Sequence, residues 1–214
     1  MTFISRQNKR TLIAVFVVLI VVAEVTAYFT TTPLPKEQFF QFYVLGSNRL
    51  AADYYPDDNP NLRLDAPLSW YLGVTNFMGN AQLIEIRLKI GNETTNAPND
   101  TTDAPSLGQV LISFDRFLMD NETWEFPFVW DISNATTSGG STHILTVQIN
   151  SKSYQVASWS ATNGYNFRVI LELWVWQTES NALEFGWNGN GEHRIAWLQL
   201  WFNLTNTTPP LPQA

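Results

Sequence analysis

The sequence contains no cysteine and has only two histidines among its 214 residues. Without cysteine no disulfide can form, so any folded part must be held together by burial of apolar side chains. The two histidines, His143 and His193, show no local ligand spacing, and no thiolate is available to complete a zinc site. We therefore expect neither a metal nor a cofactor. A metal-dependent surface enzyme stays open as the less favoured alternative, because a carboxylate partner for either histidine would depend on tertiary structure.

Basic residues are scarce outside the N-terminal segment. After residues 1–29, nine Lys and Arg are set against 18 Asp and Glu, a net charge of −9. This deficit argues against nucleic acid as a partner, because such binding depends on neutralising phosphates. It also argues against docking on an anionic membrane surface. The simplest interpretation is that the charge keeps an exposed domain soluble.

Catalytic motifs are also missing. Gly186–Gly191 lies between two strand-like runs and not between a strand and a helix, so it does not predict a phosphate loop. No serine nucleophile motif occurs. The acidic residues Asp53, Asp57 and Asp58 lack the regular spacing of a calcium loop. A carboxylate pair for glycoside hydrolysis depends on tertiary geometry, and no motif indicates one. The sequence thus predicts a protein that is not an enzyme.

The first thirty residues carry a targeting signal. Arg6, Lys9 and Arg10 precede an apolar run of 12 residues, Leu12–Ala23. A basic flank followed by an apolar stretch directs a chain to a membrane, and the positive end stays in the cytoplasm. We expect a cell-membrane protein whose N-terminus is cytoplasmic and whose C-terminal domain is extracellular.

Two interpretations of this apolar segment stay open. The unbroken run is short for a span of about 20 residues, and Val25–Ala27 is a small-x-small site that signal peptidase accepts. However, Leu12–Phe29 provides 18 residues if Glu24 lies near the outer interface, where a carboxylate reaches headgroup water. We favour a retained transmembrane helix over residues 11–29, acting as a signal anchor, with cleavage after Ala27 as the alternative.

The rest of the chain has the pattern of an all-β protein. Strand-like runs alternate with polar breaks rich in Gly and Asn. We expect strands at Gln38–Leu45, Leu68–Asn76, Gln82–Ile90, Gly108–Phe117, Trp124–Val129, Thr142–Ile149, Ser153–Trp159, Phe167–Gln177, Ala182–Trp187 and Arg194–Leu204. In Gln82–Ile90 the isoleucines alternate with Glu85, Arg87 and Lys89, so one face should be buried and the other solvated, as in an antiparallel sandwich.

These patterns divide the chain into five parts. We expect a cytoplasmic basic flank (1–10), the membrane helix (11–29), a stiff Pro-containing linker (30–37), an extracellular β-sandwich domain (38–205) and a flexible tail (206–214). Within the domain, the low-complexity stretch Asn92–Pro105 predicts a long exposed loop in one sandwich, although it could instead divide the domain into two lobes.

Six Asn-x-Ser/Thr sequons follow the apolar segment. They are Asn92, Asn99, Asn121, Asn134, Asn203 and Asn206. All lie on the side that should face outward, and most lie in expected breaks between strands, where a bulky glycan fits. We therefore expect N-linked glycans on some of them.

Four tryptophans are expected on partly polar faces of two strands. Period-two alternation places Trp174 and Trp176 on one face of their strand, and Trp197 and Trp201 on the face of the last strand that also carries Asn203. Such a strip could contact a partner protein or stack on sugar rings. We favour the alternative that another sheet edge, a loop or a glycan covers these rings.

The segment Phe39–Pro56 resembles the opening of the external domain in the domain-of-unknown-function 1616 family, found mainly in archaea. The similar residues are Phe42-Tyr43-Val44-Leu45-Gly46, Ala52 and Asp53-Tyr54-Tyr55-Pro56. Similar runs follow in the same order at Gly73–Asn76, Phe167–Trp174 and Leu200–Thr205. The larger members of the family have several membrane spans before the domain, whereas this chain has one at most.

The resemblance implies a membrane-associated protein with an external, immunoglobulin-like β-sandwich and no assigned activity or catalytic residues. Together with the residue patterns, it predicts a membrane-anchored protein of the cell surface that acts as a structural or protein-interaction module. Its expected partner is another membrane or cell-surface protein. The alternative from a different class is a carbohydrate-binding module that uses exposed Trp side chains.

Overall fold

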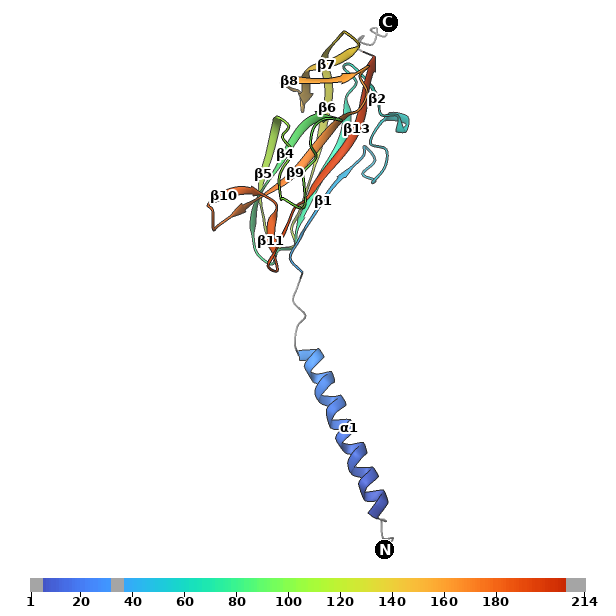
Figure 1. Ribbon diagram of the computed structural model, residues 1–214, viewed down its shortest axis with the longest axis vertical. Coiled ribbons are helices and arrows are strands. Elements are labelled where there is room, and N and C mark those ends of the chain that lie inside the picture. The colour runs from blue at the N-terminus through green and yellow to red at the C-terminus, as the bar shows by residue number, and fades with distance from the viewer. Residues whose placement is uncertain (1–5, 32–36, 207–214) are drawn as a thin grey trace. The chain divides into compact units, whose positions relative to one another are not determined.

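The computed structural model describes residues 6–31 and 37–206 (Figure 1). The chain divides into two compact units, residues 1–36 and residues 37–214. Part of the basic flank, most of the linker and nearly all of the expected tail therefore lie outside the described residues.

The first unit is a single helix, α1 (Arg6–Thr31). Its segment Thr11–Thr30 has a mean hydropathy of 2.6, and none of it is buried within the protein. Twenty helical residues span about 30 Å, the thickness of a bilayer core. The hydroxyl of Thr26 donates to the carbonyl of Val22 (2.8 Å), so this polar group is satisfied inside the helix. Helix α1 is thus consistent with a signal anchor or a signal peptide.

The second unit consists mostly of β-strands, which run along its long dimension in Figure 1. The strands are β1 (Phe40–Leu45), β2 (Asn61–Arg63), β3 (Leu68–Asn76), β4 (Gln82–Asn92), β5 (Val110–Leu118), β6 (Thr123–Ser138), β7 (Ser141–Ile149), β8 (Lys152–Thr162), β9 (Phe167–Gln177), β10 (Ala182–Phe185), β11 (Trp187–Gly189), β12 (Glu192–Arg194) and β13 (Trp197–Asn206). One short 3₁₀ helix, η1 (Pro56–Asp58), lies between β1 and β2.

The strands form two main sheets. One has the order β1-β3-β6-β7-β8, and the other has the order β2-β13-β9-β4-β5, with β10 also paired to β9. Strands β11 and β12 form a separate hairpin. Neighbouring strands are antiparallel, as predicted, except that β2 is parallel to β13. The expected strands Leu68–Asn76 and Phe167–Gln177 are confirmed to the residue as β3 and β9.

The inner faces of both sheets build one hydrophobic core. Trp130 of β6 lies edge-on to Trp70 of β3, with ring centroids 5.1 Å apart, and edge-on to Phe202 of β13, 5.4 Å apart. Phe202 in turn stacks on Phe167 of β9. This aromatic chain joins the two sheets. It provides the apolar burial that a domain without disulfides requires.

Candidate functional site

The connection between β4 and β5 crosses the outer face of the six-stranded sheet. We call residues 93–109 the strap. The backbone N–H of Ser106 donates to the Glu172 carboxylate (2.7 Å), and the backbone carbonyl of Thr95 accepts from the Arg168 guanidinium. Both contacts are to β9, so the strap is fixed over that strand. Thr95 and Ser106 are consequently buried.

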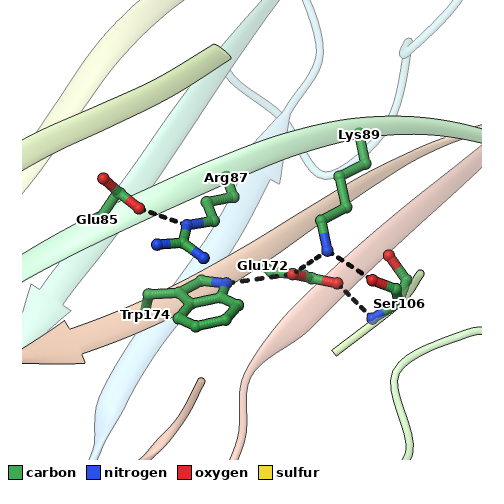
Figure 2. Close-up of polar contacts among 6 residues, drawn as sticks. All are labelled: Glu85, Arg87, Lys89, Ser106, Glu172 and Trp174. Atoms are coloured by element: carbon green, nitrogen blue, oxygen red, sulfur yellow. Dashed lines mark hydrogen bonds and ion pairs between the residues drawn. The ribbon is translucent and has the colours of Figure 1, made fainter. Parts of the chain in front are cut away.

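An ion pair is buried beneath the strap (Figure 2). Lys89 Nζ lies 2.9 Å from Glu172 Oε2, and neither side chain is more than 4% exposed. Lys89 Nζ also donates to the Ser106 carbonyl (2.7 Å), and Trp174 Nε1 donates to Glu172 Oε2 (3.1 Å). Each charged group therefore has hydrogen bonds besides its counterion, which offset the cost of removing it from water.

Sheet register explains how residues distant in sequence meet at this pair. In the β4–β9 ladder, Arg87 is directly opposite Glu172 and Lys89 is opposite Ile170. Lys89 and Glu172 are thus diagonal neighbours on one face, within reach of long side chains. Arg87 turns instead to Trp174, and its guanidinium carbon lies 3.6 Å from the centroid of that ring. Figure 2 shows Arg87 above the indole, also paired with Glu85.

Arg168 is the second buried cation of this face. It is 5% exposed, and Nη1 donates to Gln199 Oε1 (2.7 Å). Its guanidinium carbon lies 4.7 Å from the centroid of the Trp201 ring. Among the described residues no carboxylate pairs with it, and burial lowers the pKa of the guanidinium. Carbonyl, amide and aromatic groups therefore solvate this charge in place of a counterion.

The expectation that Lys89 lies on a solvated face is wrong. Period-two alternation assigns the side chain correctly to the face opposite the isoleucines, but the strap covers that part of the sheet and leaves Lys89 only 3% exposed. The loop expected over Asn92–Pro105 is exposed over most of its length, but Thr95 and Pro98 are buried, and the Thr95 carbonyl contacts Arg168 of β9.

The four outward tryptophans differ in exposure. Trp201 is 40% exposed, whereas Trp174, Trp176 and Trp197 are half-buried. Guanidinium groups lie over two of the rings, Trp174 and Trp201. The alternation of the last strand is confirmed, because Leu200, Phe202 and Leu204 are buried on the opposite side. Use of these rings to bind a partner or a glycan stays a prediction.

The expectation that most sequons lie in breaks between strands is wrong. Asn92, Asn134, Asn203 and Asn206 lie within strands. Asn99 and Asn121 lie between strands and, like Asn134, are exposed. Asn92 is half-buried, and its Nδ2 donates to the Ser160 carbonyl (2.7 Å). Asn203 Nδ2 donates to Asn61 Oδ1 (2.9 Å). A glycan on either of these two nitrogens would have to displace its hydrogen bond.

Each histidine has its own surroundings. His193 Nδ1 lies 3.0 Å from Asp103 Oδ2, which ties the strap to the β11–β12 hairpin. His143 lies on β7 opposite Thr136 and Ser160. Within residues 6–31 and 37–206, no group of three or more His, Asp or Glu side chains has an arrangement that could hold a metal ion.

A pocket of about 500 Å³ lies at the C-terminal part of the segment Phe39–Pro56, whose resemblance to a known family is described above. Its lining includes Asp53, Tyr54, Tyr55, Asp57 and Asp58. The hydroxyls of both tyrosines are engaged in hydrogen bonds to backbone carbonyls. Tyr54 donates to the Val44 carbonyl (3.3 Å), and Tyr55 donates to the Trp201 carbonyl (2.7 Å). Burial raises the pKa of Tyr55, so the hydroxyl stays protonated. These two motif tyrosines therefore brace the fold.

One carboxyl group outside the strap makes stability depend on pH. Burial, with the nearby Asp65 carboxylate second, raises the pKa of Asp131. When an acid has a higher pKa in the folded state than in the unfolded state, the protein loses stability as the pH rises through the range between the two pKa values. We expect Asp131→Asn to be more stable than wild type at pH 7, by less than about 1 kcal/mol. This advantage should vanish at about pH 3 and below, where the acid is protonated in both states.

The measurement for Asp131→Asn is urea unfolding followed by tryptophan fluorescence between pH 3 and pH 8. Asp57→Asn, at an exposed position of η1, is the matched control and should change little. An advantage of Asp131→Asn that did not vary with pH would contradict the titration explanation.

Comparison with known proteins does not assign the chain to a family. No protein-family model matches it, and no curated protein matches it significantly. Among solved structures it is similar to the sporulation control protein Spo0M from Bacillus subtilis, with 8% identity and a TM-score of 0.34 over 79% of this chain and 50% of that chain. A β-glucosidase from Listeria innocua is similar at 9% identity and a TM-score of 0.30, over 78% of this chain and 16% of that chain. The chain therefore spans half the length of Spo0M and 16% of the length of the β-glucosidase. TM-scores this low do not support the transfer of a function.

Proposed function

We propose that this protein is a membrane-anchored, extracellular protein of the cell surface that acts as a structural or protein-interaction module without catalysis. The observation that carries the proposal is the apolar segment Thr11–Thr30, none of which is buried within the protein. Apolar side chains in such number need a nonpolar environment, and a bilayer of matching thickness supplies it. The positive charges before the segment favour an orientation with the β unit outside.

The β unit, in this proposal, is an immunoglobulin-like β-sandwich. Two main sheets that share one core support this assignment, as does the resemblance of Phe39–Pro56 to the external domain of the domain-of-unknown-function 1616 family. A non-catalytic role is supported by the groups beneath the strap. Lys89 and Glu172 pair with each other and form hydrogen bonds with the strap backbone. Neither charged group is therefore free to contact a substrate.

The topology can be tested with single cysteines, because the chain has none of its own. We expect Lys152→Cys, at an exposed site at the start of β8, to react with a membrane-impermeant maleimide on intact cells. Lys9→Cys, in the basic flank, should react only after lysis. Both labelled forms should stay in the membrane fraction.

Two outcomes would contradict the proposal. Labelling of Lys9→Cys on intact cells would place the N-terminus outside. Recovery of the Lys152→Cys protein in the medium, shortened by the mass of residues 1–27, would identify a cleaved signal and a secreted protein. The cysteine-free wild type is the background control for both reactions.

A further inference from the structure

Four apolar side chains form a row across the outer face of the six-stranded sheet. Leu83 of β4 is paired with Phe117 of β5, and Leu183 of β10 is paired with Trp176 of β9. The β4–β9 ladder, in which Ile84 is opposite Val175, places Leu83 beside Trp176. We call these four residues the outer apolar row.

This row is open, unlike the rest of the outer face. Phe117 is 59% exposed, and the other three side chains are half-buried. Leu83, Phe117 and Trp176 line one pocket of about 400 Å³, together with Glu179. The next row toward the strap is already covered, since Arg87 lies over Trp174. None of the six sequons belongs to the row. An apolar surface of this kind, left uncovered by the part of the chain that the structure describes, is typical of an interaction site.

Two exposed carboxylates lie beside the row. They belong to Asp115, two residues before Phe117 on the same face of β5, and to Glu179, which lines the pocket. Neither forms an ion pair with another described residue, and the cations close by are already engaged: Arg87 with Glu85, and Arg116 with Glu122. The row therefore has a surplus of negative charge. A partner with apolar and basic groups would complement it.

The edge of the sheet suggests the form of this partner. Strand β5 pairs with β4 along one side, and no described strand pairs with its other side. An extended peptide can add to such an edge through backbone hydrogen bonds while its side chains reach the adjacent pocket. A second copy of this chain would instead bring its own two carboxylates against these two. Anionic lipid would meet the same repulsion.

We propose that the outer apolar row, with the free edge of β5, binds an extended segment of another cell-surface protein in which lysine or arginine residues stand two positions before and two positions after an apolar residue. This inference rests on the proposed function as an interaction module. The apolar side chain occupies the pocket of Leu83, Phe117 and Trp176, and the basic side chains, which share its face of the extended segment, lie against Asp115 and Glu179.

The test uses the full chain in detergent micelles and two fluorescent peptides, Thr-Lys-Thr-Phe-Thr-Lys-Thr and its acidic counterpart Thr-Glu-Thr-Phe-Thr-Glu-Thr, in which the charged side chains share one face with Phe. We expect fluorescence anisotropy to report saturable binding of the basic peptide and none of the acidic one. Phe117→Ser should weaken binding about tenfold, because the apolar anchor loses its contact surface. Glu179→Lys should weaken it to a similar extent and should also flatten its salt dependence.

Val129→Ser is the matched control, because Val129 is an exposed apolar residue on a strand of the other main sheet. It should leave binding unchanged. Equal urea midpoints of all variants would show that they are folded. Equal binding of both peptides, or equal losses in Val129→Ser and Phe117→Ser, would overturn the inference. A concentration-dependent dimer abolished by Phe117→Ser would assign the row to a second copy, and binding of anionic vesicles lost in the same variant would assign it to lipid. Each outcome overturns this inference alone, because cysteine labelling decides the topology separately.

Discussion

We expect Glu172→Gln to lower the free energy of unfolding of the β unit by about 3–5 kcal/mol. Glu172 is fully buried and accepts hydrogen bonds from Lys89, the Ser106 backbone and Trp174. Glutamine has nearly the same shape, so the loss would come from charge and not from a cavity. The Lys89 ammonium would stay buried without a counterion. Urea unfolding followed by tryptophan fluorescence measures the effect.

The matched control is the same substitution at an exposed pair. Glu37 lies 2.9 Å from Arg194, but its side chain is 66% exposed. Glu37→Gln should therefore cost less than about 1 kcal/mol. The double variant Lys89→Met and Glu172→Leu removes both charges and should recover most of the stability that Glu172→Gln loses. Similar stabilities of the Glu172→Gln and Glu37→Gln variants would contradict this account of the ion pair.

The second large effect concerns a glycine at the turn between β8 and β9. Gly164 has a φ of +75°, and a Cβ at this position would collide with the backbone carbonyl oxygen of Leu204. The Gly164 carbonyl also accepts a hydrogen bond from the Leu204 backbone N–H (2.7 Å), which fixes the end of β13. We expect Gly164→Ala to lose about 2–5 kcal/mol, from left-handed strain and from the clash together.

Gly79 separates these two contributions. Its φ is +80°, but no atom lies within 4 Å of the position that a Cβ would occupy. Gly79→Ala should therefore show only the conformational cost, about 1–2 kcal/mol. The difference between the two variants in urea unfolding gives the cost of the clash. Equal losses would show that β13 shifts freely away from the turn.

The period-two pattern predicts most strands but not their outer limits. Strands β3 and β9 agree with the sequence because apolar residues recur along them from the first residue to within two residues of the last. Strand β6 instead runs from Thr123 to Ser138, far beyond the expected end at Val129. Its second half is rich in Ser, Thr and Asn, and pairing with β7 keeps it extended. Such residues carry a turn signal in sequence, which tertiary pairing overrides.

The polar cluster of the outer face could not be found from sequence. Alternation places Lys89 and Glu172 on one face of their strands, but only the register between β4 and β9 makes them neighbours. Burial then depends on the strap, whose polar and proline-rich composition resembles an ordinary surface loop. One signal was available: the apolar character of β9 continues on both faces, because Ile170 accompanies Glu172 and Trp174 on the outer side.

Strand β9 is buried on both faces, and the apolar sequence that this requires affects the chain before it has folded. Its residues Phe167–Leu173 are buried without interruption, so the strand has layers on two sides, the core and the strap. A segment this apolar is liable to self-association while the chain is still unfolded. Arg168 and Glu172 interrupt it with charge in the unfolded chain and then become internal when the strap closes. The same two charges thus interrupt an apolar run in the unfolded chain and hold the strap in the folded one.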